Sequence, residues 1–295
     1  MFIQENKEFV KDTINENENE SKNFMNEINA AFFALLRNPT DEQIKKFRDT
    51  RDAILVGWLA AIMGNVRPQY YEAAQIGIDE ADKQLKAKKI TKVVNKKIDK
   101  KTFTDKVNSN IDSMQQDLIA ITEAIKSNSE KIIKEIKTKP AATDLKEQKK
   151  ISAELVADLK EKGITFFTDK LGRKTPIETY IRMRVFTDSV RIQRTSYFVR
   201  AIQYGVDTVR IVHLNIHPTC ELCAPFENKI LSISGNTPGY MTIEQAENFG
   251  LFHPNCDHVP EELELAPEDK GDEGEIELNK KNQKRFEYNE KRKII

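Results

Sequence analysis

The segment that decides the C-terminal fold runs from His213 to His258 and reads HLNIHPTCELCAPFENKILSISGNTPGYMTIEQAENFGLFHPNCDH. It contains all 3 cysteines and all 4 histidines of the 295-residue chain. Residues 217–220 and 253–256 both have the pattern His-Pro-x-Cys, and Cys220 and Cys223 form a Cys-x-x-Cys pair. Thiolate and imidazole donors on two short turns, each stiffened by a proline, are typical of a zinc site.

There are more candidate ligands than coordination positions on one zinc ion. Zinc takes four nitrogen or sulfur ligands in a tetrahedron, and a structural site fills all four with protein atoms. The first choice is Cys220, Cys223, His253 and Cys256. His217 and His258 are alternatives, because either could replace His253 or hydrogen-bond the site from outside. A redox pair is the competing interpretation, but no βαβ pattern precedes the Cys-x-x-Cys. The sequence therefore predicts a structural Zn²⁺.

Composition excludes several other classes of protein. Hydrophobic residues make up 39% and charged residues 32%, which favours long helices with much exposed surface. The 47 basic and 47 acidic residues cancel, so no overall field attracts nucleic acid. Three cysteines do not make a disulfide framework and suggest synthesis in a reducing compartment. Residues 1–20 lack the apolar core of a signal peptide.

The first 101 residues are expected to form an N-terminal helical bundle. Apolar residues recur at helical spacing in 1–37, Asn38-Pro39 breaks the pattern, and the next helix carries the apolar run 53–63. Because that run is apolar on every side, we expect it at the centre of the bundle. Membrane insertion is the alternative, although the run is shorter than the roughly 20 residues that span a bilayer. Gly64-Asn65 is predicted to end this helix, with another from 68 to about 86.

Residues Lys86 to Lys101 form a basic block with eight lysines and one aspartate. One interpretation is contact with the phosphates of packaged DNA. The other is a solvated helix face, since the block lacks the arginines and aromatic residues common in nucleic-acid sites.

Residues 102–162 are predicted to form long helices. Seven apolar residues follow the 4-3-4-3-4-7 spacing of a coiled-coil seam, with the polar Asn128 in the gap. They are Val107, Ile111, Met114, Leu118, Ile121, Ile125 and Ile132. Such a seam needs a partner helix, from the same chain or from another subunit of an oligomer. A further helix is expected at about 143–162, ending at Gly163.

Residues 163–260 are expected to form a small α+β module. Strands are predicted at 164–168, 206–214 and 229–233, and a short helix at 242–249. A longer helix is predicted from an N-cap at Thr175 to about 204, with an outer face rich in arginine: Arg182, Arg184, Arg191, Arg194 and Arg200. The module looks too small to fold around its own core, so a zinc ion would supply the missing stability.

The expected fold class is therefore mostly α. An elongated helical N-terminal half with a coiled-coil-like helix precedes the small α+β, zinc-stapled C-terminal module. The remaining tail, 261–295, is first acidic and then basic, and is expected to stay disordered or to dock as a peptide.

Several blocks of residues 163–258 match a known family. They are GITFFTDKLGRKT (163–175), PIETYIRMR (176–184), Arg194-Thr195, YGVDTVRI (204–211), CELCAPFENKILSISG (220–235) and GLFHPNCDH (250–258). In these blocks the chain resembles the minor capsid (minor head) proteins of tailed bacteriophages, related to the Mu-type head-morphogenesis proteins. It departs from them at Asn228, where they usually have glycine, and at Asp257, where they usually have arginine.

The resemblance implies a structural component of the virion, made in the host cytoplasm. Such proteins sit at the portal vertex or inside the phage head, contact the portal or other capsid proteins, and assist head assembly and DNA packaging or ejection. No catalytic constellation accompanies the zinc-type ligands, so an enzyme is not expected.

Two other functions compete with the structural one. A zinc-dependent nuclease or other hydrolase would keep an open zinc position for water, with His217, Glu227 and His258 as general-base candidates. Four or more strong ligands, however, tend to close such a site. A nucleic-acid-binding zinc module would use Lys86 to Lys101 together with the arginine-rich helix.

Overall fold

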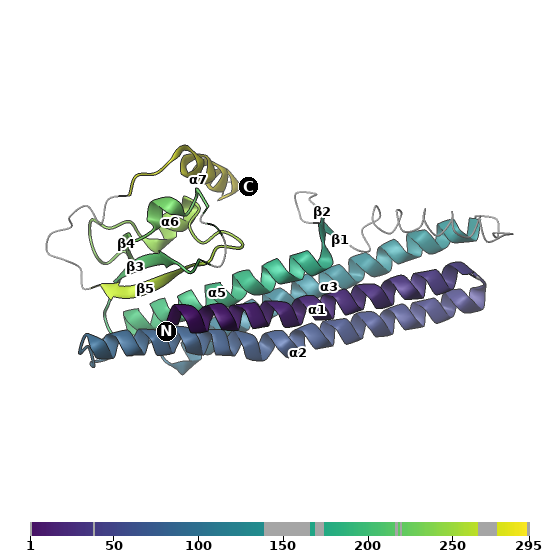
Figure 1. Cartoon of the computed structure of the whole chain (residues 1–295), viewed down its shortest axis with the longest axis horizontal. Coiled ribbons are helices and arrows are strands. Elements are labelled where there is room, and N and C mark those ends of the chain that lie inside the picture. The colour runs from purple at the N-terminus through teal and green to yellow at the C-terminus, as the bar shows by residue number, and fades with distance from the viewer. Residues whose placement is uncertain are drawn as a thin grey trace. The chain divides into compact units, whose positions relative to one another are not determined.

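The computed structural model describes residues 2–37, 39–138, 166–168, 174–215, 218, 220–264 and 276–293. As predicted, it is mostly helical with a small strand-containing C-terminal region (Figure 1). The long helices are α1 (Phe2–Arg37), α2 (Asp41–Ala87), α3 (Lys100–Thr138) and α5 (Ile177–Gln203). The chain forms two compact units. Unit 1 comprises Met1–Asp12, Pro68–Asn110 and Phe186–Ile295, and unit 2 comprises Thr13–Arg67 and Ile111–Val185.

Unit 2 is built on helices that pack through aromatic and aliphatic side chains. Phe24 of α1 stacks on Trp58 of α2, with ring centroids 4.5 Å apart, and the indole N–H lies 3.4 Å from Ser21 Oγ. The apolar run 53–63 is only half buried, because Leu55, Trp58 and Ile62 face the core while Val56 is 67% exposed. Among the described residues, no helix is long and apolar enough to cross a membrane.

Helix α2 is continuous, which corrects the predicted break at Gly64-Asn65. It runs from Asp41 to Ala87 through Gly64, Asn65 and Pro68. A glycine costs a helix interior about 1 kcal/mol and a proline about 3 kcal/mol, so the local signal for a break was real. Ile62, Val66 and Tyr70 are fully buried around these positions. Burying each such side chain contributes roughly 1.5–3 kcal/mol, and the sum exceeds the local cost.

The predicted seam of α3 is buried within this single chain. All seven seam residues are at most 2% exposed, so the surface that covers them belongs to the same chain. The buried polar residue of the seam is Ser129, whose hydroxyl donates to Ile125 O at 2.6 Å, and not Asn128, which is half-buried. The supercoil stays a prediction. The helix expected at 143–162 and Gly163 lie outside the described residues.

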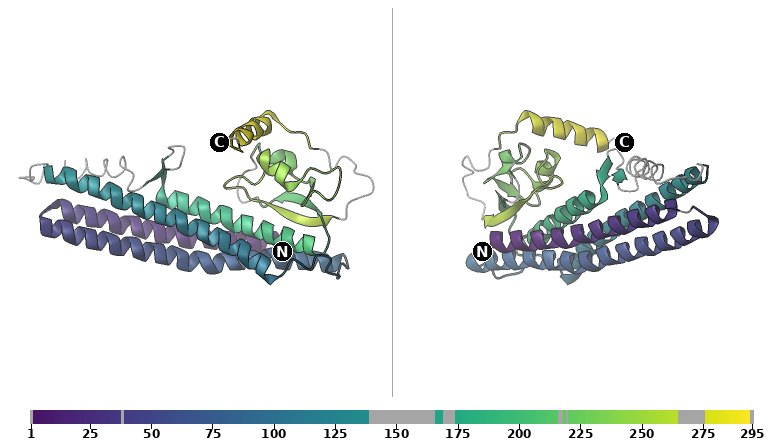
Figure 2. Two further views of the ribbon diagram at one scale, coloured as in Figure 1. Left: turned by 180° about the vertical axis from the view of Figure 1, so that it is seen from behind. Right: turned by 45° about the vertical axis from the view of Figure 1, so that its right-hand side comes forward.

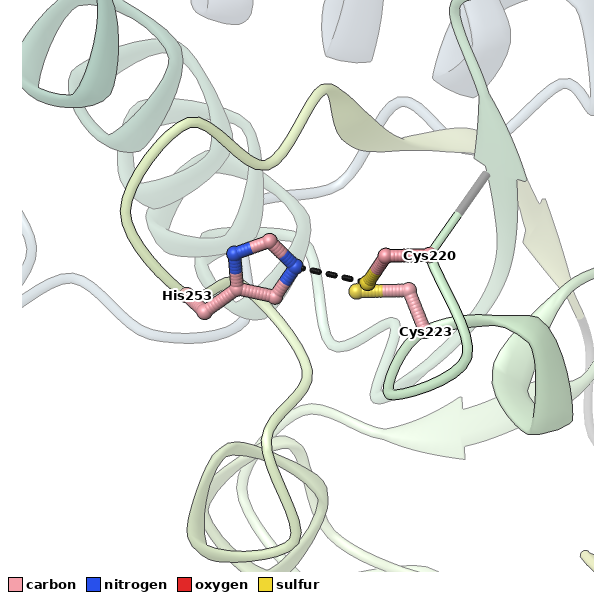
Figure 3. A group of neighbouring side chains, drawn as sticks. All are labelled: Cys220, Cys223 and His253. Carbon is pink, nitrogen blue, oxygen red and sulfur yellow. Dashed lines mark hydrogen bonds between the residues drawn. The ribbon is translucent and has the colours of Figure 1, made fainter. Parts of the chain in front are cut away.

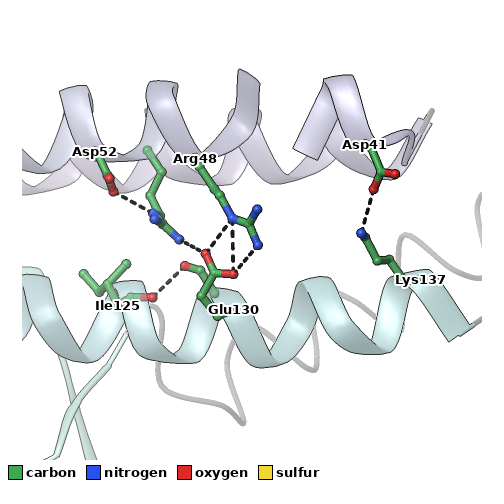
Figure 4. Close-up of polar contacts among 8 residues, drawn as sticks. Asp41, Arg48, Asp52, Ile125, Glu130 and Lys137 are labelled. Carbon is green, nitrogen blue, oxygen red and sulfur yellow. Dashed lines mark hydrogen bonds and ion pairs between the residues drawn. The ribbon is translucent and has the colours of Figure 1, made fainter. Parts of the chain in front are cut away.

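Charged residues join α2 to α3 within unit 2 (Figure 4). Glu130 accepts hydrogen bonds from Arg48 at 2.6 Å and from Arg51 at 2.9 Å, and Lys137 pairs with Asp41 at 2.6 Å. The hydrogen bond from Arg48, followed by that from Arg51, lowers the pKa of Glu130 to about 2 despite partial burial. The carboxylate is therefore charged throughout the neutral range.

A two-stranded hairpin precedes α5. Strands β1 (Phe166–Thr168) and β2 (Lys174–Pro176) pair antiparallel, with Phe167 opposite Thr175. Thr175 therefore lies in a strand and α5 begins at Ile177, so the predicted helix start is wrong by one residue, within the usual uncertainty of helix ends.

The sheet of unit 1 has the antiparallel order β4-β3-β5. Its strands are β3 (Thr208–His213), β4 (Ile230–Ser232) and β5 (His258–Glu264). Strand β5 was missed because it contains Pro260 and several acids. It is an edge strand, where a residue without an N–H is tolerated, and Pro260 pairs with Ile211 just before a register shift in β5.

Two short helices complete this part of unit 1. Helix α6 (Ile243–Asn248) begins at the predicted Thr242, whose side chain forms a capping box with Gln245. It lies between the sheet and α7 (Lys280–Lys293) in the views of Figures 1 and 2. Asn282 of α7 donates to Leu222 O at 2.8 Å and to Phe249 O at 2.9 Å, so this helix of the tail is attached to the module.

The core of the C-terminal module includes helical residues far away in the sequence. Cys223 and Cys256 pack with strand residues and with the ends of α2 and α5, among them Leu85 and Tyr197. Residues of α2, outside 163–260, therefore complete the core of the module, which does not rely on its own residues alone.

The basic block is mainly a loop rather than a helix face. Helix α2 ends at Ala87 and α3 begins at Lys100. The N–H groups of Val94 and Asn95 both donate to Gln203 O at 3.0 Å, and the Gln203 amide donates to Ile98 O at 2.7 Å. The backbone of this loop is therefore fixed against the end of α5, while its lysines are largely exposed.

Candidate metal centre

The first cysteine turn follows strand β3. The N–H of Cys223 donates to Cys220 O at 3.1 Å, which closes the turn, and a short 3₁₀ helix (Ala224–Phe226) continues from it. Asn228 has a φ of 59° and its N–H donates to Ile211 O at 2.8 Å, which returns the chain to β3. Asparagine tolerates this left-handed conformation better than most residues, so the difference from glycine preserves the turn.

The second turn follows α6. Phe252 and Asn255 have φ values of 60° and 63°, and the N–H of Cys256 donates to His253 O at 3.0 Å. The N–H of Asn255 also donates to Thr187 Oγ1 of α5 at 3.1 Å. The His-Pro-x-Cys turn is therefore fixed both by its own backbone and by a helix.

The two turns bring their donor atoms together. Figure 3 shows the ring of His253 directed at the Cys220 sulfur, with Nε2 and Sγ 2.8 Å apart. The sulfurs of Cys223 and Cys256 are 3.5 Å apart. The donor atoms of Cys220, Cys223 and His253 lie within 4.8 Å of one another, as do those of Cys223, Cys256 and His258. Cys223 is common to both groups, and Cys256 is grouped with His258 rather than with Cys220 and His253. The choice between His253 and His258 as the fourth ligand therefore stays a prediction.

The arrangement suits a tetrahedral ion bound through sulfur. With Zn–S bonds of about 2.3 Å, two sulfurs of a tetrahedron lie about 3.8 Å apart, close to the separation between Cys223 and Cys256. All three cysteines are free thiols, and Cys223 and Cys256 are buried. Two buried thiols whose sulfurs lie 3.5 Å apart without forming a disulfide are compatible with two sulfur ligands of one metal ion.

Each histidine at the centre has its second ring nitrogen held by an acceptor. His253 Nδ1 lies 2.7 Å from Pro254 O, and His258 Nε2 lies 3.0 Å from Glu227 Oε1. The remaining nitrogen of His258 lies 3.4 Å from the Cys256 sulfur. Such outer hydrogen bonds are usual for metal-binding histidines because they orient the ring. His217 lies outside the described residues.

A buried acid–histidine pair beside the centre was not foreseen. His213 Nε2 lies 2.8 Å from Asp257 Oδ1, and its ring stacks on that of His258 with centroids 4.7 Å apart. Asp257 is only 3% exposed. His213 of β3 pairs directly with His258 of β5. Because β5 was not predicted from the sequence, this pairing could not be foreseen.

The buried thiols Cys223 and Cys256 titrate as a pair. The hydrogen bond from Cys223, and then those from His258 and the charge of Arg194, lower the pKa of Cys256. The same sulfur contact and burial raise the pKa of Cys223. Burial opposes the charged form of His258, but its hydrogen bonds to Cys256 and Glu227 raise its pKa. A metal that binds both sulfurs must displace the remaining thiol proton.

Arg194 lies next to these groups and not on an outer face, which corrects the arginine-rich surface predicted for α5. Its side chain is 4% exposed, and its guanidinium lies 3.9 Å from the centroid of the Phe252 ring. It also donates to His258 O at 3.2 Å. Burial lowers the pKa of Arg194 to about 10, so it stays charged at neutral pH.

Comparison with known protein families gives a match over most of the chain. A family model described as phage minor capsid protein 2 matches residues 36–293. No curated protein and no solved structure matches the chain. The match extends well beyond residues 163–258 and includes most of the long helices.

Proposed function

The chain belongs to the phage minor capsid protein 2 family, and we propose that it is a structural protein at the portal or in the interior of the phage head. There it assists head assembly and DNA packaging or ejection. Its partners are the portal or other capsid proteins. The family match over 36–293 is the observation that carries this proposal.

A structural Zn²⁺ is proposed for the C-terminal module. Cys220, Cys223, His253 and Cys256 would hold it, and His258 would hydrogen-bond the Cys256 thiolate from outside. The ion would tie together two turns whose ligands are 33 residues apart in the sequence. Its chemistry is that of a closed tetrahedral cross-link, which stabilises the folded module over the unfolded chain.

The same geometry supports a structural role over hydrolysis. Four protein donors leave a tetrahedral ion without an open position for water. Of the general-base candidates, His258 and Glu227 hydrogen-bond each other at 3.0 Å, which suits an orienting pair.

The first experiment is elemental analysis of the full chain purified without added metal. We expect about one zinc per chain, in agreement with a four-ligand site. Cys220→Ser and Cys256→Ser should each abolish zinc retention, whereas Glu244→Gln, an exposed change on α6 in the same module, should preserve it. Zinc-free protein with an unchanged melting curve would rule out the structural ion.

The second experiment concerns the virion. Mass spectrometry of purified particles, with and without the packaged DNA, should detect the chain in few copies, and crosslinking should join it to portal or capsid proteins. Its absence from particles would contradict the proposed location.

We also propose that the loop between α2 and α3 contacts packaged DNA. Its lysines are largely exposed and its backbone is fixed, which lowers the entropy cost of binding. Changing Lys92, Lys96 and Lys97 to glutamine should lower the salt dependence of DNA binding by roughly 1 unit of log–log slope for each phosphate that is no longer neutralised. Changing the exposed Lys11, Lys45 and Lys46 is the charge-matched control. Equal slopes in both variants would exclude this loop as the contact.

A further inference from the structure

A charged side chain is buried beside the metal centre without a carboxylate partner. Arg194 extends from α5 and is 4% exposed. Its contacts are the carbonyl of His258, 3.2 Å away, and the ring face of Phe252, 3.9 Å away. Among the described residues, no carboxylate forms an ion pair with this guanidinium. Buried charges are normally paired, so the missing negative charge has to be found nearby.

Both contacts of Arg194 belong to residues adjacent to the proposed ligands. Phe252 directly precedes His253, and His258 follows Cys256 by two positions. Favourable charge interactions link the guanidinium to the sulfurs of Cys256 and Cys223. Glu247 also attracts it, but Glu247 is exposed to solvent and its side chain forms no ion pair with Arg194 among the described contacts. The thiolates are therefore the natural counter-charge.

The charge of the centre follows from its ligands. A Zn²⁺ ion with three thiolates and one neutral imidazole carries a net charge of about −1. Such a buried anion needs compensation just as the buried arginine does. One guanidinium and one three-thiolate centre cancel each other.

We propose that Arg194 is the counter-ion of the metal centre and that it selects an anionic, three-thiolate zinc site. The inference rests on the proposed structural zinc. Arg194 is a positioning and charge-balancing residue and not a ligand, because guanidinium has no lone pair to offer at neutral pH. Its attachment to the carbonyl of His258 and to Phe252 keeps the charge next to the second turn.

The test compares zinc affinities of three variants of the full chain. Zinc-loaded wild type, Arg194→Gln, Arg194→Lys and Arg191→Gln are titrated with a chromophoric chelator at one pH. Arg191 is the matched control, because it lies one turn earlier on α5 and its side chain is 47% exposed. We expect Arg194→Gln to bind zinc roughly 10–100-fold more weakly, as for other residues that support metal ligands. Arg194→Lys and Arg191→Gln should stay within about threefold of wild type.

The outcomes separate charge from packing. Wild-type affinity in Arg194→Gln would overturn the proposal, and so would a lysine variant as weak as the glutamine variant, because lysine preserves the charge but not the shape. If Arg194→Gln does not fold, the readout is zinc-dependent folding of Arg194→Lys, and an equally unfolded lysine variant overturns the proposal. A wild-type chain that binds no zinc would instead refute the metal site itself.

Discussion

Gly77→Ala tests the closest approach between two helices of unit 1. A Cβ on Gly77 of α2 would lie 2.2 Å from the Gln193 carbonyl oxygen of α5, and 3.0 Å and 3.2 Å from the carbonyl carbon and Cα of the same residue. All three atoms belong to the backbone, so no side chain can rotate away. The helices must separate to admit a single methyl group.

The expected cost follows from opposing effects. Alanine is favoured over glycine in a helix interior by about 1 kcal/mol. Overpacking a rigid contact typically costs about 1–3 kcal/mol and occasionally more. Separation would also strain hydrogen bonds between the same helices, from Tyr70 to Asp188 at 2.9 Å and from Tyr197 to Gln84 at 2.6 Å. Because the clashing atoms are backbone, overpacking should lie near its upper value of about 3 kcal/mol. The gain in helix propensity of about 1 kcal/mol is offset by about 1 kcal/mol from the strained hydrogen bonds. We therefore expect a net destabilisation of about 3 kcal/mol.

Gly57→Ala in the same helix is the matched control. Nothing lies within 4 Å of its added Cβ, so only the helix propensity changes. This variant should be more stable than wild type by up to about 1 kcal/mol. Urea unfolding followed by circular dichroism measures both variants under identical conditions. Equal stabilities of the two variants would show that α2 and α5 do not approach each other as closely as described.

Four further changes test other parts of the molecule. Glu130→Gln should lower the free energy of unfolding at pH 7 by about 1–2 kcal/mol, a value reduced for the solvent screening of a partly exposed pair. Because folding lowers the pKa of Glu130 from 4.5 to about 2, its contribution is complete above pH 4.5 and disappears as the pH falls through 2. Acid titrations of wild type and variant should therefore converge at low pH, and parallel curves would contradict the linkage. Asp207→Ala removes an acceptor of hydrogen bonds from Ser232, Ser234 and Thr237, and should cost about 2–4 kcal/mol, seen as faster hydrogen exchange in 232–237; unchanged exchange would count against this role. Cys256→Ser should unfold residues 206–258 while the N-terminal helices keep their circular dichroism, and intact folding in a strong chelator would argue against a structural metal. Ile121→Asp buries a charge at a 2% exposed position and should lower helical stability by at least about 3 kcal/mol; an unshifted melting curve would refute its burial.

Short-range patterns were sufficient for much of the fold. The spacing of the α3 seam identified its buried residues because helical periodicity places them on one face whatever covers it. The short helix predicted at 242–249 corresponds to α6, whose start at Thr242 is fixed within one turn by a capping box with Gln245. The two cysteine turns were recognisable for the same reason, since residues three apart in a tight turn can reach one ion.

The errors arose where distant contacts outweigh local preference. Helix α2 continues through Gly64 and Pro68 because buried side chains compensate their local cost. Strand β5 accepts Pro260 because it lies at an edge, and edge position is a property of the whole sheet. The buried polar residue of the seam is Ser129 and not the predicted Asn128. Which of two neighbouring helical residues is buried depends on the surface that packs against the helix.

The sequence by itself determined which residues can bind a metal, which face of α3 is apolar and which family the C-terminal blocks resemble, because each depends on residue type and short spacing. Only the tertiary structure showed that His258 hydrogen-bonds Glu227, that His213 pairs with Asp257, and that Arg194 is buried near the cysteine turns. Burial and electrostatic pairing depend on which distant segments meet, and that information is not contained in any one stretch of the chain.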